Sequence, residues 1–195
     1  GGGNGYTNTM FWLRTGIGVM KFVHPDDTNR DEKEEYIRKK AEPAIRYAEI
    51  LLIYAEALNE LTGNYNIASW DEETQYTIQR NIDEMKKGIQ PIRIRAGIPD
   101  YTRSEYEDQD LFREKLKRER QIELMGEGHR YYDIRRWKDA EVEESLPIYG
   151  CNTLMTEKWR DVFHVPVAIP SLPTNFSRKM YFWPISHSEL KLNKM

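Results

Sequence analysis

The chain has 195 residues with a net charge of −3, 31% charged residues and 12% aromatic residues. This length supports one domain with a sizeable core, the aromatic content argues against disorder, and the weak negative charge gives no general attraction to nucleic acid or anionic membranes. A single cysteine, Cys151, excludes an intrachain disulfide framework and a multi-cysteine metal site.

The first 42 residues are predicted to form loop and extended structure. Glycines open the chain, and polar residues and further glycines interrupt the apolar run from Met10 to Val23. These glycines have neither the Gly-Lys-Ser/Thr of a P-loop nor the preceding strand of a dinucleotide fingerprint, so we interpret them as loop residues. Residues 30–40 are mostly charged with mixed signs, which is typical of a solvated face.

Two helices are predicted next. Pro43 suits the first position of a helix and Gly63 its end, and the residues between them are apolar almost all round, which predicts a helix inside a helical stack. Ser69 and Glu72 match a capping box for a second helix that ends near Gly88. Joined by a short Gly-Asn-Tyr-Asn loop, the pair is predicted to form an αα-hairpin that resembles one tetratricopeptide unit.

Residues 92–96 alternate apolar and basic side chains. This pattern alone would fit a strand. Pro91 before the segment and Gly97 with Pro99 after it predict a short separate element, whose type the pattern leaves open.

The stretch from Asp110 to Trp137 combines basic, acidic and aromatic residues at high density. Asp110 is predicted to cap a helix that Gly126 or Gly128 ends. Leu111, Ile122 and Met125 form one apolar strip of that helix, and a second apolar side carries two acids.

The two acids, Glu119 and Glu123, fall on the same side of the helix as Phe112 and Leu116. A buried, ionised carboxylate is costly unless it is paired. The sequence therefore predicts a structural ion-pair network. The arginines expected to join it are Arg93, Arg95, Arg130, Arg135 and Arg136.

Catalysis by Glu119 and Glu123 is the alternative to this structural role. Residues one turn apart have Cβ atoms about 5–6 Å apart, which allows the geometry of a retaining glycosidase. Glycosidase carboxylates flank an open cleft from different elements, whereas these two share an apolar face, so we expect no enzyme activity. His129 has no second histidine at a spacing typical of metal sites, and neighbouring acids offset the basic and aromatic residues that follow it. Neither a metal, a cofactor nor nucleic acid is expected.

Residues 139–195 are predicted to be an irregular, proline-rich tail with a small hairpin at most. Ser186 and Glu189 are predicted to cap a final helical turn. The expected organisation is a single domain, 1–195, with a lead (1–42), a helical core (43–138) and this tail (139–195). The fold class is mainly α, with tetratricopeptide-like helical hairpins and an irregular, β-poor C-terminal part.

Four segments, in the same order, resemble the C-terminal half of proteins of the SusD/RagB family. They are RYAEILLIYAEALNE (46–60), RIRAGIP (93–99), RERQIELMGEGHRYYDIRRWKD (118–139) and YFWPISHSEL (181–190). Four ordered motifs are far more specific than any one of them.

The resemblance implies a non-catalytic protein on the cell surface that binds glycans or other nutrients and delivers them to a TonB-dependent, SusC-like transporter of the outer membrane. It also implies that the family's lipid anchor and N-terminal half lie outside this chain. Sugars are recognised by aromatic rings with a few polar contacts. The ligand-binding residues expected on exposed loops are Trp12, Tyr65 and Trp70. The alternative function is a helical-repeat scaffold that associates with proteins and binds no sugar.

Overall fold

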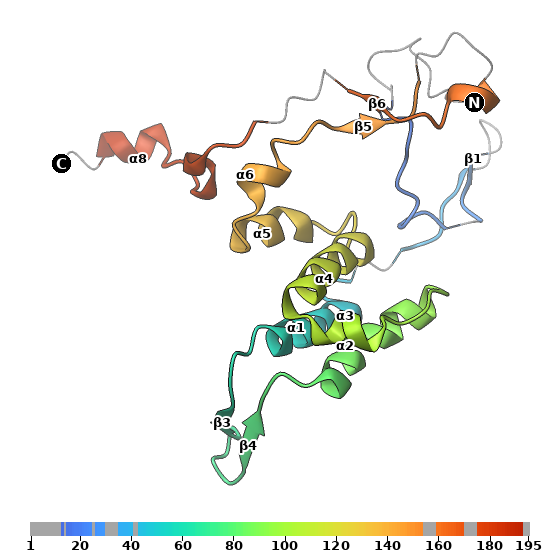
Figure 1. Cartoon of the computed structure of the whole chain (residues 1–195). Coiled ribbons are helices and arrows are strands. Elements are labelled where there is room, and N and C mark those ends of the chain that lie inside the picture. The colour runs from blue at the N-terminus through green and yellow to red at the C-terminus, as the bar shows by residue number, and fades with distance from the viewer. Residues whose placement is uncertain are drawn as a thin grey trace. The chain divides into compact units, whose positions relative to one another are not determined.

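The computed structural model describes residues 13, 15–24, 26–29, 35–40, 43–153, 159–169 and 175–192. The fold is mainly helical, as the sequence predicts, with short two-stranded sheets (Figure 1). The chain divides into two compact units. We call Thr28–Arg130 the helical unit, and the described residues of 1–27 and 131–195 the second unit.

The helical unit contains most of the longer elements. In chain order they are β1 (Thr28–Asn29), β2 (Glu35–Tyr36), α1 (Tyr47–Asn59), β3 (Tyr65–Ala68), β4 (Gln75–Ile78), α2 (Ile82–Arg95), α3 (Arg103–Glu107) and α4 (Gln109–Glu123). The short strands β1 and β2 pair antiparallel, and α1 packs against both α2 and α4.

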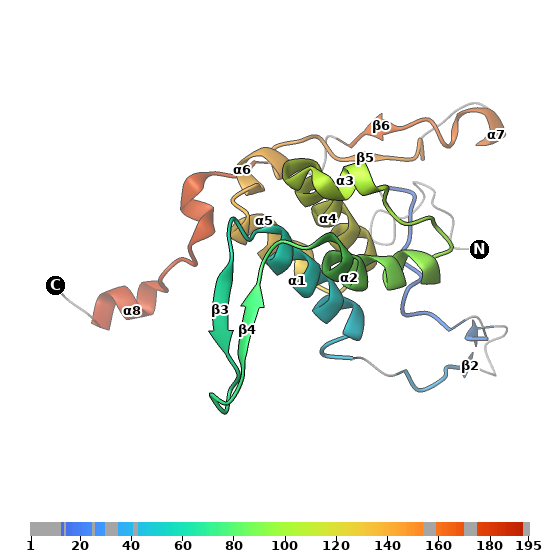
Figure 2. The same ribbon diagram turned by 60° about the horizontal axis from the view of Figure 1, so that its bottom comes forward.

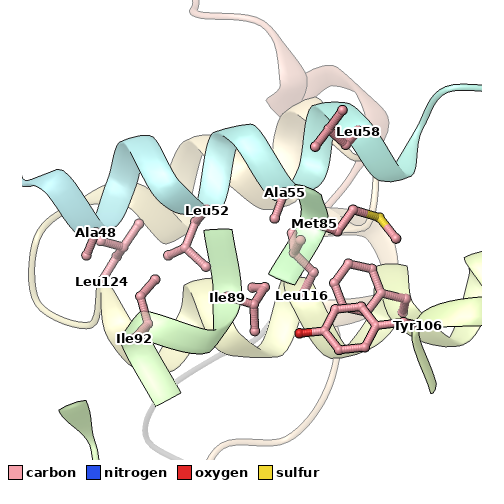
Figure 3. Close-up of a cluster of buried hydrophobic side chains, with 11 residues drawn as sticks. Ala48, Leu52, Ala55, Leu58, Met85, Ile89, Ile92, Tyr106, Leu116 and Leu124 are labelled. Atoms are coloured by element: carbon pink, nitrogen blue, oxygen red, sulfur yellow. The ribbon is translucent and has the colours of Figure 1, made fainter. Parts of the chain in front are cut away.

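One face of α1 forms the centre of the core. Ala48, Leu52 and Ala55 recur at helical spacing and are almost fully buried, and they lie against α2 and α4 (Figure 3). Ile50 and Ile53, on the other side of α1, are 47% and 46% exposed. The described chain therefore covers only one face of the helix, which also begins and ends inside the predicted range of 43–62.

Helix α2 is continuous where the sequence predicted a break. Asn81 caps its start by accepting a hydrogen bond from the backbone N–H of Glu84 (3.1 Å). Proline inside a helix costs about 3 kcal/mol, and Pro91 is exposed in α2. Burial of Ile89 and Ile92 beside it offsets that cost. The predictions of a helix end near residue 88 and of a separate element at 92–96 were therefore wrong.

A β-hairpin, β3–β4, stands where a short loop was predicted between the helices (Figure 2). Ser69 and Glu72 do not form the predicted capping box. They belong to the hairpin turn, in which Glu72 has a φ of 61° and the Ser69 N–H donates to the Thr74 carbonyl oxygen (2.7 Å). Aromatic and β-branched residues such as Tyr76 and Ile78 favour a pleated strand over a helix, which explains the error.

Helix α4 begins at Gln109, and its N-cap is Asp108 rather than the predicted Asp110. The Asp108 carboxylate accepts hydrogen bonds from the backbone N–H groups of Asp110 (3.1 Å) and Leu111 (3.0 Å). Phe112 and Leu116 are buried as predicted. The end of the helix at Glu123 precedes the glycines that were expected to end it.

The second unit is built from short elements. They are α5 (His129–Arg136, whose first residues belong to the helical unit), α6 (Ala140–Glu143), β5 (Tyr149–Gly150), α7 (Trp159–Val162), β6 (Val167–Ala168), a 3-10 helix η1 (Arg178–Tyr181) and α8 (His187–Leu192). Ile134, Ala140 and Phe176 form a small core. The strands β5 and β6 pair antiparallel over two residues each, across a long connection, so this part of the chain is as poor in β structure as the sequence predicts. Ser186 caps α8 as predicted, by accepting from the N–H of Glu189 (3.3 Å).

Candidate functional site

Glu119 on α4 is buried and paired with α2. One of its carboxylate oxygens accepts hydrogen bonds from Arg93 Nη1 (2.6 Å) and from the Tyr101 hydroxyl (2.8 Å). The Arg93 guanidinium also lies 3.9 Å from the centroid of the Tyr101 ring. Burial, together with the hydrogen bond to Glu119, raises the pKa of Tyr101 above its usual value. The guanidinium of Arg93 therefore balances the negative charge of Glu119 inside the protein, where a substrate does not reach the carboxylate.

Glu123, one turn further along, joins α4 to two other segments. It accepts hydrogen bonds from Arg95 at the end of α2 and from Arg46 Nη1 (2.8 Å), just before α1. Arg46 also donates to both carboxylate oxygens of Glu127 (2.7 and 2.8 Å) and to the backbone oxygen of Glu123 (2.9 Å). Bidentate arginine–carboxylate pairs are the stronger kind. We call Arg46, Arg93, Arg95, Tyr101, Glu119, Glu123 and Glu127 the clasp, because they connect α1, α2 and α4.

Arg46 was missed in the sequence analysis. It precedes the first turn of α1, and its spacing from Glu123 and Glu127 along the chain carries no signal. The only indication in the sequence was that Arg46 is the first residue of the segment 46–60, one of the four segments that resemble a known family. The hydrogen bonds that Arg46 donates to Glu127 raise the pKa of Arg46 more than burial lowers it, so the guanidinium stays charged.

The clasp predicts an acid-dependent loss of stability. Burial alone would raise the pKa of the Glu123 carboxyl, but hydrogen bonds from Arg95 and Arg46 outweigh burial and hold the pKa below its usual 4.5. A depressed pKa in the folded state contributes stability that is complete above the unfolded value and is lost as the pH falls through the folded value. We expect the urea midpoint to fall as the pH drops below about 4.5, and to fall less for Glu123→Gln. Parallel pH curves for the two proteins would contradict this expectation.

The other predicted arginines lie on α5. Arg136 Nε is 2.9 Å from an Asp133 oxygen. Arg135 lies 3.5 Å from the centroid of the Tyr131 ring and donates to the Tyr131 carbonyl oxygen (2.9 Å). Arg130 is half-buried near the start of the helix. The structure thus shows Arg135 and Arg136 in local contacts on α5.

Two of the predicted ligand-binding residues lie on the β3–β4 hairpin. Trp70, in the turn, is 96% exposed, and Tyr65, on β3, is 46% exposed. Ile67 and Tyr76 are a cross-strand pair that is 47% and 55% exposed. The sequence analysis missed this pair, although alternation of apolar residues with a period of two was visible once a strand is considered. Trp12 lies outside the described residues.

The hairpin turn is acidic. Asp71, Glu72 and Glu73 follow Trp70 directly, and no lysine or arginine occurs between residues 63 and 79. A hydrogen bond from the Ser69 hydroxyl, with another from the Glu73 N–H, lowers the pKa of Asp71. The turn therefore presents an exposed tryptophan beside negative charge at neutral pH.

Two negative findings apply to the described part of the chain alone. Within it, no three histidine, cysteine or acidic side chains gather in a way that could hold a metal ion. No helix among those residues has both the length and the apolar character needed to cross a bilayer.

Comparisons with known proteins give one family. The sequence model of the SusD family matches residues 1–195. The chain is also similar to the SusD-like protein P2 of Formosa agariphila (strain DSM 15362 / KCTC 12365 / LMG 23005 / KMM 3901 / M-2Alg 35-1), with 37% identity over 97 residues. The matched segment covers 48% of this chain and 16% of that relative, so the similarity spans a small part of the relative's length. No solved structure matches the chain.

Proposed function

The chain belongs to the SusD family, and from this premise we propose that it is part of a surface protein that binds glycans or other nutrients and delivers them to a TonB-dependent transporter. SusD-family proteins are non-catalytic binding proteins that act with SusC-like transporters. In this proposal a lipid anchor on a segment outside the chain holds the protein at the cell-surface side of the outer membrane. The chain itself contributes scaffold and part of the ligand surface.

The paired acids support a binding role over catalysis. A glycosidase needs two carboxyl groups that reach the substrate from either side of the scissile bond. The side chains of Glu119 and Glu123 are only 6% and 12% exposed, and arginines bind both. Their chemistry is therefore that of a structural ion pair.

The main support for a ligand contact at the hairpin is the exposure of Trp70. A tryptophan that is 96% exposed contributes almost nothing to the core, and its flat ring can stack on the apolar face of a sugar. The neighbouring Asp71 carboxylate and Thr74 hydroxyl supply polar groups of the kind that fix a sugar's orientation. Tyr65 is a second aromatic contact in this proposal. The Tyr65 hydroxyl lies 3.3 Å from Thr62 Oγ1.

Trp70→Ala is expected to weaken glycan binding about two- to tenfold, because one aromatic stacking contact contributes about 0.5–1.5 kcal/mol. The ligand is first chosen from a panel of oligosaccharides, and its affinity is then measured by calorimetry with the intact protein. The free energy of unfolding should change by less than about 0.5 kcal/mol, since Trp70 lies outside the core.

Trp183→Ala is the matched control, because Trp183 is another exposed tryptophan (77%). We expect it to leave the affinity unchanged. An unchanged affinity for Trp70→Ala would remove this residue from the ligand site. Failure of the intact protein to bind any oligosaccharide would remove glycan recognition and favour the scaffold function instead.

A further inference from the structure

The turn of the β3–β4 hairpin, residues 69–74, is held by hydrogen bonds that meet at one carboxylate. The Asp71 Oδ1 atom accepts from the Ser69 hydroxyl and from the Glu73 N–H (3.2 Å). The Ser69 hydroxyl oxygen accepts from the Thr74 N–H (3.0 Å). Because both bonds to the Asp71 side chain end on Oδ1, the Oδ2 atom of this exposed residue is left to accept from a ligand. The turn therefore fixes a carboxylate on the residue that follows Trp70.

The turn carries negative charge with no positive charge close to it along the chain. Asp71, Glu72 and Glu73 are all exposed. The hydrogen bond from the neighbouring serine hydroxyl keeps the pKa of Asp71 below its usual value, so this carboxylate is ionised at neutral pH. The nearest basic residue in the sequence is Arg80, whose guanidinium donates to the Asn59 side-chain oxygen (3.0 and 3.2 Å). The hairpin also extends away from the helices of its own unit in both views (Figures 1 and 2). A ligand at the turn therefore meets an excess of negative charge.

These groups distinguish between two chemical classes of saccharide. A neutral sugar presents hydroxyl groups that donate hydrogen bonds, and a carboxylate accepts a hydrogen bond more strongly than an uncharged group does. The carboxylate or sulfate group of an acidic sugar presents only acceptors and a negative charge. Such a group cannot donate to Asp71, and the carboxylates of the turn repel it. The Trp70 ring can stack on a sugar of either class, so it does not separate the two.

We propose that this turn selects uncharged saccharides over anionic ones. In this arrangement Asp71 is the acceptor that determines specificity, and Glu72 and Glu73 repel ligands that carry carboxylate or sulfate groups. The inference rests on the proposed function, because that function makes the turn a contact for glycans. The new element is the chemical class of the ligand.

Calorimetry with the intact protein and matched pairs of saccharides tests this selectivity. The probes are maltohexaose and cellohexaose, each beside the same chain with its primary hydroxyl groups oxidised to carboxylates, within the wider panel of oligosaccharides. We expect a neutral member to bind at least about tenfold more tightly than its oxidised counterpart at low salt, and the difference to shrink as the salt concentration rises. An oxidised member that binds as tightly as the neutral one overturns the inference and leaves the proposed function standing. If the intact protein binds no saccharide at all, both proposals fail.

Two variants separate the two roles of the acids. Asp71→Asn removes the charged acceptor and is expected to weaken binding of the neutral member about fivefold, because a hydrogen bond to a charged group is stronger than one to a neutral group. Glu72→Gln together with Glu73→Gln keeps that acceptor and removes the repulsion. This pair should leave the affinity for the neutral member unchanged and raise the affinity for the oxidised member.

Asp110→Asn is the matched control, because it removes the same charge from an exposed side chain (89%) on a different element, α4. We expect this control to change neither affinity. The inference is overturned if Asp71→Asn behaves as the control does, or if the glutamine pair leaves the affinity for the oxidised member unchanged. Binding of the neutral member by the unchanged protein would still support the proposed function in either case.

Discussion

Replacing Gly88 by valine is expected to lower the free energy of unfolding by about 3 kcal/mol, because overpacking in a close-packed core costs about 1–3 kcal/mol and occasionally more. Gly88 lies on the buried face of α2 against α1. A Cβ atom there would be 2.5 Å from the Leu51 carbonyl oxygen and 2.8 Å from the Ala55 Cβ. The first of these is a backbone atom and the second is a Cβ atom, so rotation of a side chain on α1 cannot move either of them away.

Alanine at position 88 separates the steric effect from helix propensity. Alanine is favoured over glycine inside a helix by about 1 kcal/mol, so Gly88→Ala should destabilise by less than Gly88→Val. Gly63→Ala is the matched control, because nothing lies within 4 Å of a Cβ placed there. Urea unfolding of the three variants gives the comparison. If Gly88→Val unfolds at the same urea concentration as Gly63→Ala, α1 and α2 do not approach as closely as described.

Helical periodicity correctly predicted the part of the core that depends on a single helix. The spacing of Phe112, Leu116 and Glu119, four residues and then three, placed all three on one side of α4, and all three are buried. Contacts between helices were harder to predict from the sequence, because the residue that lies opposite a given side chain depends on how two distant segments pack together. Arg46, which lies far along the chain from Glu123 and Glu127, shows this limit.

The hairpin shows a different limit. Ser69 and Glu72 satisfied the sequence rule for a helix start, yet Glu72 adopts a positive φ that a helix does not allow. The competing signal was the alternation around Ile67 and Tyr76, and pairing with the neighbouring strand decided between the two patterns. Because this error fell on the segment with the exposed aromatic residues, the apolar face of the hairpin could not be predicted, whereas the exposure of Trp70 could.

Glu119→Ala is expected to destabilise the protein by about 3–5 kcal/mol, the range found when one partner is removed from a buried ion pair. The variant leaves the guanidinium of Arg93 and the hydroxyl of Tyr101 without the oxygen to which both donate. Most of the cost is the uncompensated charge of Arg93, whose side chain is only 14% exposed. Urea unfolding at neutral pH measures the difference.

The matched control is Glu107→Ala, which removes an acid from an exposed pair. Arg103 and Glu107 are 79% and 56% exposed, and such surface pairs contribute about 0–1 kcal/mol. The double variant Arg93→Met with Glu119→Leu should recover part of the stability lost in Glu119→Ala, because it removes the buried charge together with its partner. If Glu119→Ala proves no more harmful than Glu107→Ala, the clasp does not hold α2 on α4, and the argument against a catalytic Glu119 loses its main support.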